Sequence, residues 1–250
     1  MKPTLLILTL STAAALTSAL GVLPLVGRRR VPTRWIGLGN AIAAGMMLGA
    51  AYMLSALEGS TASTGSAQPG VFEAIGAILG IVFIYWTHVA VGTEGLELNR
   101  SRADDPIHGY RILMVNGLHS GSEGMAMAVA MVIDVRFGVL VAGALAVHNI
   151  PEATVLAAVL RGRGLSLGQI TGLAMATNVS QPLLAVAAYS VVTAAPAALP
   201  WVLGFAIGAL VQLVLVELLP ESYREAGQGS IALVTVVALG VVVLIQGLVG

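Results

Sequence analysis

Long apolar runs fill the sequence, and each is separated from the next by a short break rich in polar residues, proline or glycine. A membrane-spanning helix needs about 20 apolar residues to cross roughly 30 Å of hydrocarbon. Eight runs fit, at approximately 4–26, 35–57, 71–93, 109–133, 137–160, 166–192, 197–219 and 229–249. The pattern predicts an all-α integral membrane protein of about eight transmembrane helices, with residues 1–250 as a single transmembrane domain. The count becomes seven if the last two runs are not separate spans.

The composition agrees with a chain whose outer surface faces lipid. It is 57% hydrophobic and 10% charged, whereas soluble domains carry about 25% charged residues. Glycine is abundant, and small residues let membrane helices pack closely. The spaced pairs Gly45/Gly49, Gly76/Gly80 and Gly204/Gly208 could serve either internal packing or a homodimer face. The zero net charge and the lack of a basic patch argue against a nucleic-acid partner.

The basic residues predict the orientation in the membrane. If the N-terminus lies outside, the cytoplasmic connections and their margins hold Arg28, Arg29, Arg30, Arg34, Arg100, Arg102, Arg111, Arg161, Arg163 and Arg224. The outer side then holds only Lys2 and Arg136. Cytoplasmic loops of membrane proteins carry an excess of Lys and Arg. We therefore expect a multi-pass protein of the cell (inner) membrane, with both termini outside the cytoplasm.

Two consecutive predicted helices repeat one pattern of ionisable residues. The fourth reads HSGSEG, with His119 and Glu123, and the fifth reads HNIPEA, with His148 and Glu152. Residues four apart share one face of a helix. Each pair begins about ten residues into its span, which at 1.5 Å per residue is near the bilayer midplane. Ionisable residues are costly at that depth, so they indicate a functional site.

Two imidazoles and two carboxylates are a suitable ligand set for a divalent transition metal. We therefore predict a metal site formed by His119, Glu123, His148 and Glu152. The alternative is that each His–Glu pair is a buried ion pair within its own helix. The repetition at matching depth on consecutive helices favours the metal site. The chain has no cysteine, so thiolate ligands are excluded, and no organic cofactor is expected.

These motifs resemble those of the ZIP (Zrt- and Irt-like) family of divalent metal transporters. The family's fourth-helix motif H-N-x-P-E-G is matched by His119, Glu123 and Gly124, and its fifth-helix motif by His148, Pro151 and Glu152. The Glu-Pro pair of helix six appears as Gln181–Pro182, and H-E-L-x-P-E of helix seven as Val216–Glu221. The resemblance implies a 3+2+3 bundle with inverted repeats, and metal transport toward the cytoplasm.

The chain departs from the family pattern at several positions. Ser120 replaces the usual Asn, Asn149 replaces a common acid, and Gln181 replaces Glu. We expect these three residues to line a weaker, secondary metal site. Two divalent ions would face only the carboxylates of Glu123 and Glu152, and uncompensated charge is costly in a bilayer. One tightly held ion per chain is therefore expected.

The predicted function is transport of a divalent transition metal ion, zinc first, with iron, manganese, cobalt or cadmium as alternatives. Glu217 and His88 lie toward the cytoplasmic ends of their helices and are candidates for the release path. The rival functions are an intramembrane metal-dependent hydrolase and a metal-binding relative that does not transport. A hydrolase needs a general base and substrate access, and no extra base accompanies the motifs, so no enzyme is expected. The expected partners are metal ions and the lipid bilayer, with a homodimer left open.

Overall fold

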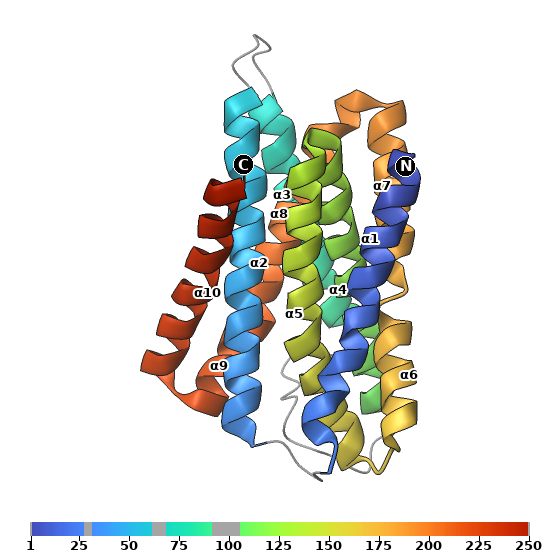
Figure 1. Cartoon of the computed structure of the whole chain (residues 1–250), viewed down its shortest axis with the longest axis vertical. Helices are drawn as coiled ribbons and strands as arrows, with labels where there is room; N and C mark the ends of the chain where they lie inside the picture. Colours follow the sequence, from blue (N-terminus) through green and yellow to red (C-terminus); the bar gives the residue numbers. More distant parts are fainter. Residues whose placement is uncertain (1, 28–31, 62–68, 92–105, 250) are drawn as a thin grey trace.

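The computed structural model describes residues 2–27, 32–61, 69–91 and 106–249, and within these ranges the chain is nearly all helical, without a β-strand. The elements are α1 (Pro3–Thr17), η1 (Ser18–Leu25), α2 (Thr33–Thr61), α3 (Pro69–Val91), α4 (Pro106–Ile133), α5 (Val135–Gly162), α6 (Leu167–Thr177), α7 (Ser180–Ala194), η3 (Pro196–Ala198), α8 (Leu199–Leu213), η4 (Val214–Leu218), α9 (Leu219–Ala226) and α10 (Gln228–Val249). Figure 1 shows them as one bundle of long, roughly parallel rods.

Some neighbouring elements form one continuous rod. The first rod joins α1 to the 3₁₀ helix η1, another joins α6 to α7, and a third runs from α8 through the π-helical η4 into α9. Seven rods in the described part of the chain are long and apolar enough to cross a membrane. The other long helix, α4, carries the polar HSGSEG motif along its middle. The predicted all-α fold with about eight spans is confirmed.

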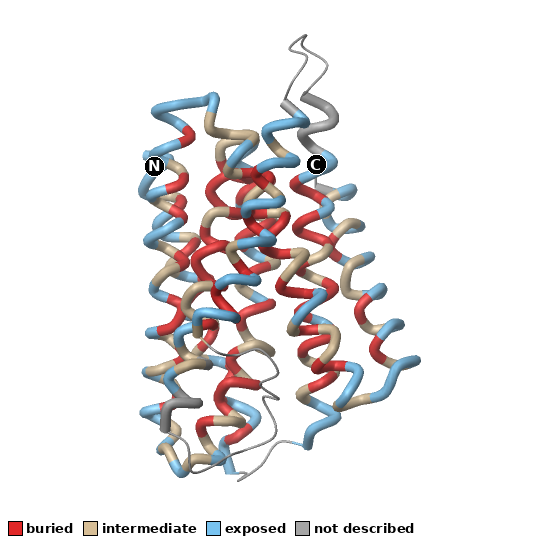
Figure 2. The backbone as a smooth tube through the Cα atoms, turned by 180° about the vertical axis from the view of Figure 1, so that it is seen from behind, coloured by how far each residue is buried: buried red, intermediate tan, exposed pale blue. Residues whose placement is uncertain are grey.

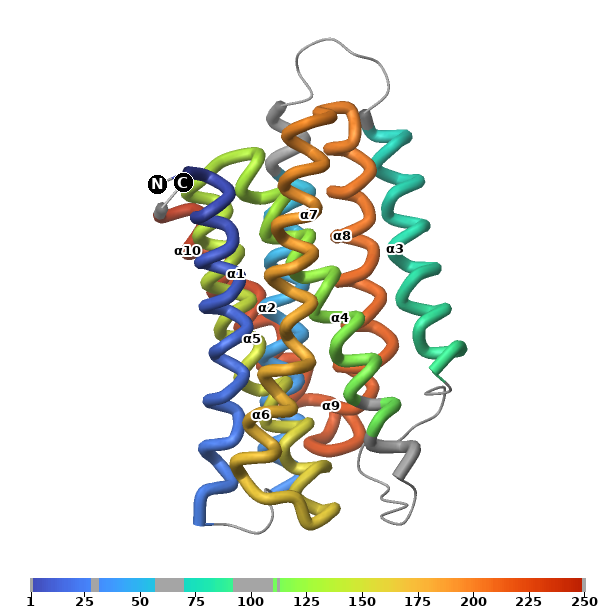
Figure 3. The backbone as a smooth tube through the Cα atoms, turned by 90° about the vertical axis from the view of Figure 1, so that its right-hand side faces the viewer, coloured from blue at the N-terminus to red at the C-terminus, as the bar shows by residue number. Residues whose placement is uncertain are grey.

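The chain order and the packing give the predicted 3+2+3 arrangement, with α4 and α5 at the centre. Both described ends of the chain lie at one end of the bundle, at the top of Figure 1, and α9 lies near the other. We call these the N/C end and the α9 end. Figure 3 shows α3 lying along α8 and the rod of α6 and α7 beside α4. The chain is a multi-pass membrane protein.

The spaced glycine pairs serve internal packing. A methyl group on Gly76 or Gly80 would overlap a backbone carbonyl of α8, and one on Gly204 or Gly208 would overlap backbone atoms of α3. On α2, a methyl group on Gly45 would overlap the Thr235 carbonyl of α10, and one on Gly49 would crowd the Val242 side chain. Small residues at these positions let the helix backbones approach closely. The alternative of a dimer face is not needed to explain these glycines.

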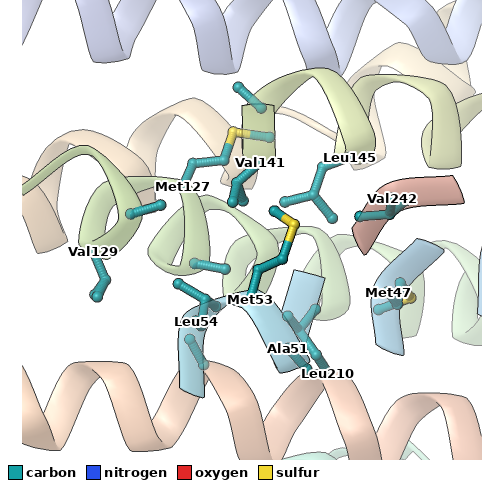
Figure 4. Packing of buried hydrophobic residues seen from close by; sticks show 14 of the residues in the cluster. Met47, Ala51, Met53, Leu54, Met127, Val129, Val141, Leu145, Leu210 and Val242 are labelled. Atoms are coloured by element: carbon teal, nitrogen blue, oxygen red, sulfur yellow. The ribbon is translucent and has the colours of Figure 1, made fainter. Parts of the chain in front are cut away.

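The larger of two apolar core clusters extends through the half of the bundle nearer the N/C end, and a smaller one joins η1, α5 and α6. Figure 4 shows Met53 of α2 near Val141 and Leu145 of α5, and Met47 of α2 near Val242 of α10, within one cluster that also holds Met127 of α4. From Gly124 to Ile133, α4 has no polar side chain, and α5 has none from Phe137 to Val147. Buried residues continue through the centre of the bundle in Figure 2. We call these two stretches of α4 and α5 the apolar plug. Glu123, His148 and Glu152 lie on its side toward the α9 end.

Candidate metal centre

Glu123 of α4 and His148 and Glu152 of α5 form a compact cluster, which we call the first triad. One ligand atom from each lies within 4.8 Å of the other two. His148 Nε2 is 3.1 Å from Glu123 Oε1 and 3.6 Å from Glu152 Oε2. Glu123 and His148 are fully buried, whereas the Glu152 side chain is 12% exposed. Three of the four predicted ligands are therefore brought together.

The local sequence explains why these side chains converge. His148 and Glu152 are four residues apart on α5 and so point to the same side of the helix. Gly124 follows Glu123 on α4, and a Cβ there would overlap the backbone carbonyl of Gln181 on α7. The missing side chain lets α7 approach α4 closely. This approach places the Gln181 amide against the Glu123 carboxylate.

His119 lies in a different cluster, which we call the second triad. It groups with His88 of α3 and Glu217 of η4, again with one ligand atom each within 4.8 Å. Glu217 Oε2 is 3.5 Å from both His88 Nε2 and His119 Nδ1, and the two imidazole rings are 5.3 Å apart. The structure thus joins His119 to the two residues predicted for the release path. No spacing along the sequence signals this grouping, because its members come from three separate elements.

The residues predicted for the secondary site lie beside the first triad and are hydrogen-bonded. Ser120 Oγ donates to Asn178 Oδ1 at 2.6 Å, near the break between α6 and α7. Asn149 Nδ2 donates to Gln181 Oε1 at 3.1 Å and to the Ala14 carbonyl at 2.9 Å. Gln181 Nε2 in turn donates to Glu123 Oε2 at 3.2 Å. Both amides thus use their NH₂ groups as donors, leaving Asn149 Oδ1 without a hydrogen-bond partner among the described residues.

Several buried ligand atoms also have no hydrogen-bond partner within the described ranges. They include Glu152 Oε2 of the first triad, and Glu217 Oε2 and His119 Nε2 of the second. Buried polar atoms normally have a partner, so each exception needs an explanation. Imidazole nitrogens and carboxylate oxygens are the donors that Zn²⁺ and similar divalent metals accept. The donor set of each triad therefore fits such an ion.

Known proteins resemble this chain over most of its length. The family model described as ZIP zinc transporter matches residues 94–246, which hold all of the first triad and two members of the second. A putative zinc transporter of Arabidopsis thaliana is 32% identical over 92% of this chain and 36% of its own length. Zinc transporter ZIPB of Bordetella bronchiseptica is 27% identical over 83% of this chain and 70% of its own.

The Zinc transporter ZIP13 homolog of Drosophila melanogaster is 26% identical over 53% of this chain. The chain spans only 36% of the Arabidopsis protein and 39% of the Drosophila protein. The family match nevertheless covers more than half of the chain and contains the motifs of α4 and α5. Together with the helical bundle, it establishes that the chain belongs to the ZIP zinc transporter family.

Proposed function

We propose that the chain transports a divalent transition metal ion, with zinc as the preferred substrate, through the first triad. The observation that carries the proposal is the convergence of Glu123, His148 and Glu152 inside a bundle of membrane-crossing helices. The relatives in Arabidopsis, Drosophila and Bordetella are named as zinc transporters, which supports zinc. Their family argues for a transporter rather than an enzyme.

The charges of the first triad suit one divalent ion. Two ionised carboxylates balance the charge of the ion, and a neutral imidazole adds a nitrogen ligand. Charge balance matters here because unpaired charge inside a bilayer is costly. Three protein ligands leave a fourth position of a tetrahedral site for water, as in catalytic zinc sites. An ion held in this way can exchange a water for the next ligand along its route.

We assign the second triad to the release path. Its donors are two imidazoles and the carboxylate of Glu217, whose side chain is 25% exposed. The apolar plug covers the first triad on the side of the N/C end. The excess of basic residues supports an orientation with the α9 end in the cytoplasm and both termini outside the cytoplasm, in the inner membrane. Transport would then run toward the cytoplasm, with the whole chain acting as one transmembrane domain.

Zinc uptake into proteoliposomes tests this function. The purified chain is reconstituted with a zinc-sensitive dye inside the vesicles, and uptake is compared for wild type, Glu152→Ala and Glu73→Ala. Glu73 lies on α3, in neither triad. We expect Glu152→Ala to reduce uptake to the level of empty liposomes and Glu73→Ala to retain it. Equal losses in the two variants, or no uptake by wild type, would reject the proposal.

Cysteine labelling tests the proposed orientation. Ser63 and Arg102 lie in the second and third connections, outside the described residues. On intact cells, an impermeant thiol reagent should label Ser63→Cys and leave Arg102→Cys unlabelled until the cells are opened. The reverse result would place the α9 end outside and overturn the proposed direction.

A further inference from the structure

A chain of hydrogen bonds links the first triad to the backbone of α1. It begins at the Ala14 carbonyl, passes through Asn149 of α5 and Gln181 of α7, and ends on Glu123 Oε2. Its three hydrogen bonds measure 2.9, 3.1 and 3.2 Å, and Asn149 and Gln181 are fully buried. Four helices therefore meet in a single polar connection that terminates on a candidate metal ligand.

The hydrogen bonds of this series can point in only one direction. A backbone carbonyl only accepts hydrogen bonds, so Asn149 must turn its NH₂ group toward Ala14. The second hydrogen of this NH₂ group goes to Gln181 Oε1. Gln181 must then offer its own NH₂ group to Glu123, since an ionised carboxylate also only accepts. Acids at positions 149 and 181 would place acceptors against acceptors, so the two amides are the residue types that fit.

The two oxygens of Glu123 consequently have different partners. Oε2 accepts from Gln181, while Oε1 lies 3.1 Å from His148 within the first triad. A carboxylate held in this way presents one oxygen to an ion in the triad. Rotation to present both oxygens would break the bond to Gln181 and leave its buried NH₂ group unsatisfied. Such a loss costs about 1–3 kcal/mol.

We propose that Gln181 is a positioning residue that sets the metal preference of the first triad by holding Glu123 to single-oxygen ligation. The inference rests on the proposed function, since it concerns the same site. Zinc sites in proteins are usually four-coordinate and tetrahedral, which suits one oxygen from each carboxylate. Manganese favours six oxygen-rich ligands in an octahedron, which a two-oxygen carboxylate helps to complete. Fixing Glu123 therefore favours zinc over manganese.

Equilibrium binding of Zn²⁺ and Mn²⁺ to the full chain in detergent tests the proposal. Gln181→Met keeps a similar volume but removes the donor to Glu123. The zinc dissociation constant should rise about 10-fold or more, as is typical when a group supporting a metal ligand is lost. The manganese constant should change less than about 3-fold, so the preference for zinc narrows. X-ray absorption at the zinc edge should show an added oxygen neighbour in the variant.

Thr177→Val is the matched control. It removes the acceptor of a 3.0 Å hydrogen bond from Asn116 between α4 and α6, and neither residue belongs to a triad. It should leave both dissociation constants unchanged. A second variant, Asn149→Leu, removes the donor to Gln181 and should shift the preference in the same direction but less. If Gln181→Met does not elute from size-exclusion chromatography as a folded protein, the result for Asn149→Leu decides whether the inference holds.

The outcomes separate this inference from the proposed function. Gln181→Met could weaken the binding of zinc and of manganese equally, or change the binding of neither. In both cases Gln181 does not set the metal preference, and the inference is overturned. The proposed function survives that result. If wild type binds no zinc that depends on Glu152, the proposed function itself fails, and the inference fails with it.

Discussion

The two triads contain the same kinds of ligand but are built differently. The first comes from two adjacent central helices, and its Glu123 is fully buried and fixed by Gln181. The second comes from three separate elements, and its contacts at 3.5 Å centre on the partly exposed Glu217. Ligands fixed by surrounding hydrogen bonds bind more tightly than loosely held ones. Under the proposed function, the first triad would hold an ion and the second would pass it on.

Charge separates the triads further. The first triad has two carboxylates that could face an ion, and the second has only one. A divalent ion is neutralised in the first case and retains a net positive charge in the second. Because net charge within a bilayer is costly, the second triad should bind more weakly. The second triad should therefore bind a divalent ion with lower affinity than the first triad and exchange it faster.

Removing one carboxylate from each triad should give the largest contrast. Glu123→Ala leaves one carboxylate in the first triad, and loss of one charged partner in a buried site costs about 3–5 kcal/mol. We expect zinc affinity to fall about 100-fold or more, since 1.4 kcal/mol is a factor of 10. Glu217→Ala should change affinity less than about 3-fold but slow zinc uptake. Isothermal titration and liposome flux would measure the two effects. A greater loss of affinity in Glu217→Ala would reverse the comparison.

Metal stoichiometry should show an intermediate contrast. After dialysis against trace zinc, elemental analysis should find close to one ion per chain, held by the first triad. A second ion should appear only at zinc concentrations at least about 10-fold higher, given the weaker charge balance of the second triad. His88→Ala should abolish the second ion alone. Two ions of equal affinity in wild type would show that the difference in charge does not control binding.

A substitution between α3 and α8 should have the smallest effect on metal binding, because it alters the packing of two helices and removes no member of either triad. A methyl group on Gly208 would overlap the backbone of Ala77, whereas one on Gly240 of α10 meets nothing within 4 Å. Gly208→Ala should destabilise the chain by about 1–3 kcal/mol, as overpacking does. Gly240→Ala should leave stability unchanged or raise it by up to about 1 kcal/mol. Thermal unfolding in detergent measures both, and equal shifts would contradict the packing.

The sequence predicts the helices well because apolar length is a local property. The predicted span 137–160 lies within α5, and span 71–93 largely coincides with α3. Interruptions within the rods are harder to predict. The span 166–192 is broken at Asn178 and Val179, four and three residues before Pro182, the proline that removes a backbone hydrogen bond there. The π-helical turn of η4 similarly precedes Pro220.

The grouping of the ligands is the part that the sequence could not supply. The spacing of His119 and Glu123 correctly places them on one face of α4, but they lie a full turn apart. A turn is enough for each residue to meet a different neighbour, α5 for Glu123 and η4 for His119. Which neighbour each residue meets depends on how far the helices are shifted relative to one another along their axes. The close contacts at glycine help to set this shift. The role of Gln181 as a donor also required the position of α7 relative to α4.

The apolar plug has a kinetic consequence. An ion at the first triad would meet only apolar side chains from Gly124 to Ile133 of α4 and from Phe137 to Val147 of α5. These side chains of α4 and α5 offer the ion no oxygen or nitrogen ligand in place of its lost water, so this conformation disfavours free diffusion from the N/C end. Under the proposed function, each passage would wait for helices to move, and collective movements of this kind take microseconds to seconds. Flux should therefore saturate with zinc concentration and depend steeply on temperature, as for a carrier rather than an open pore.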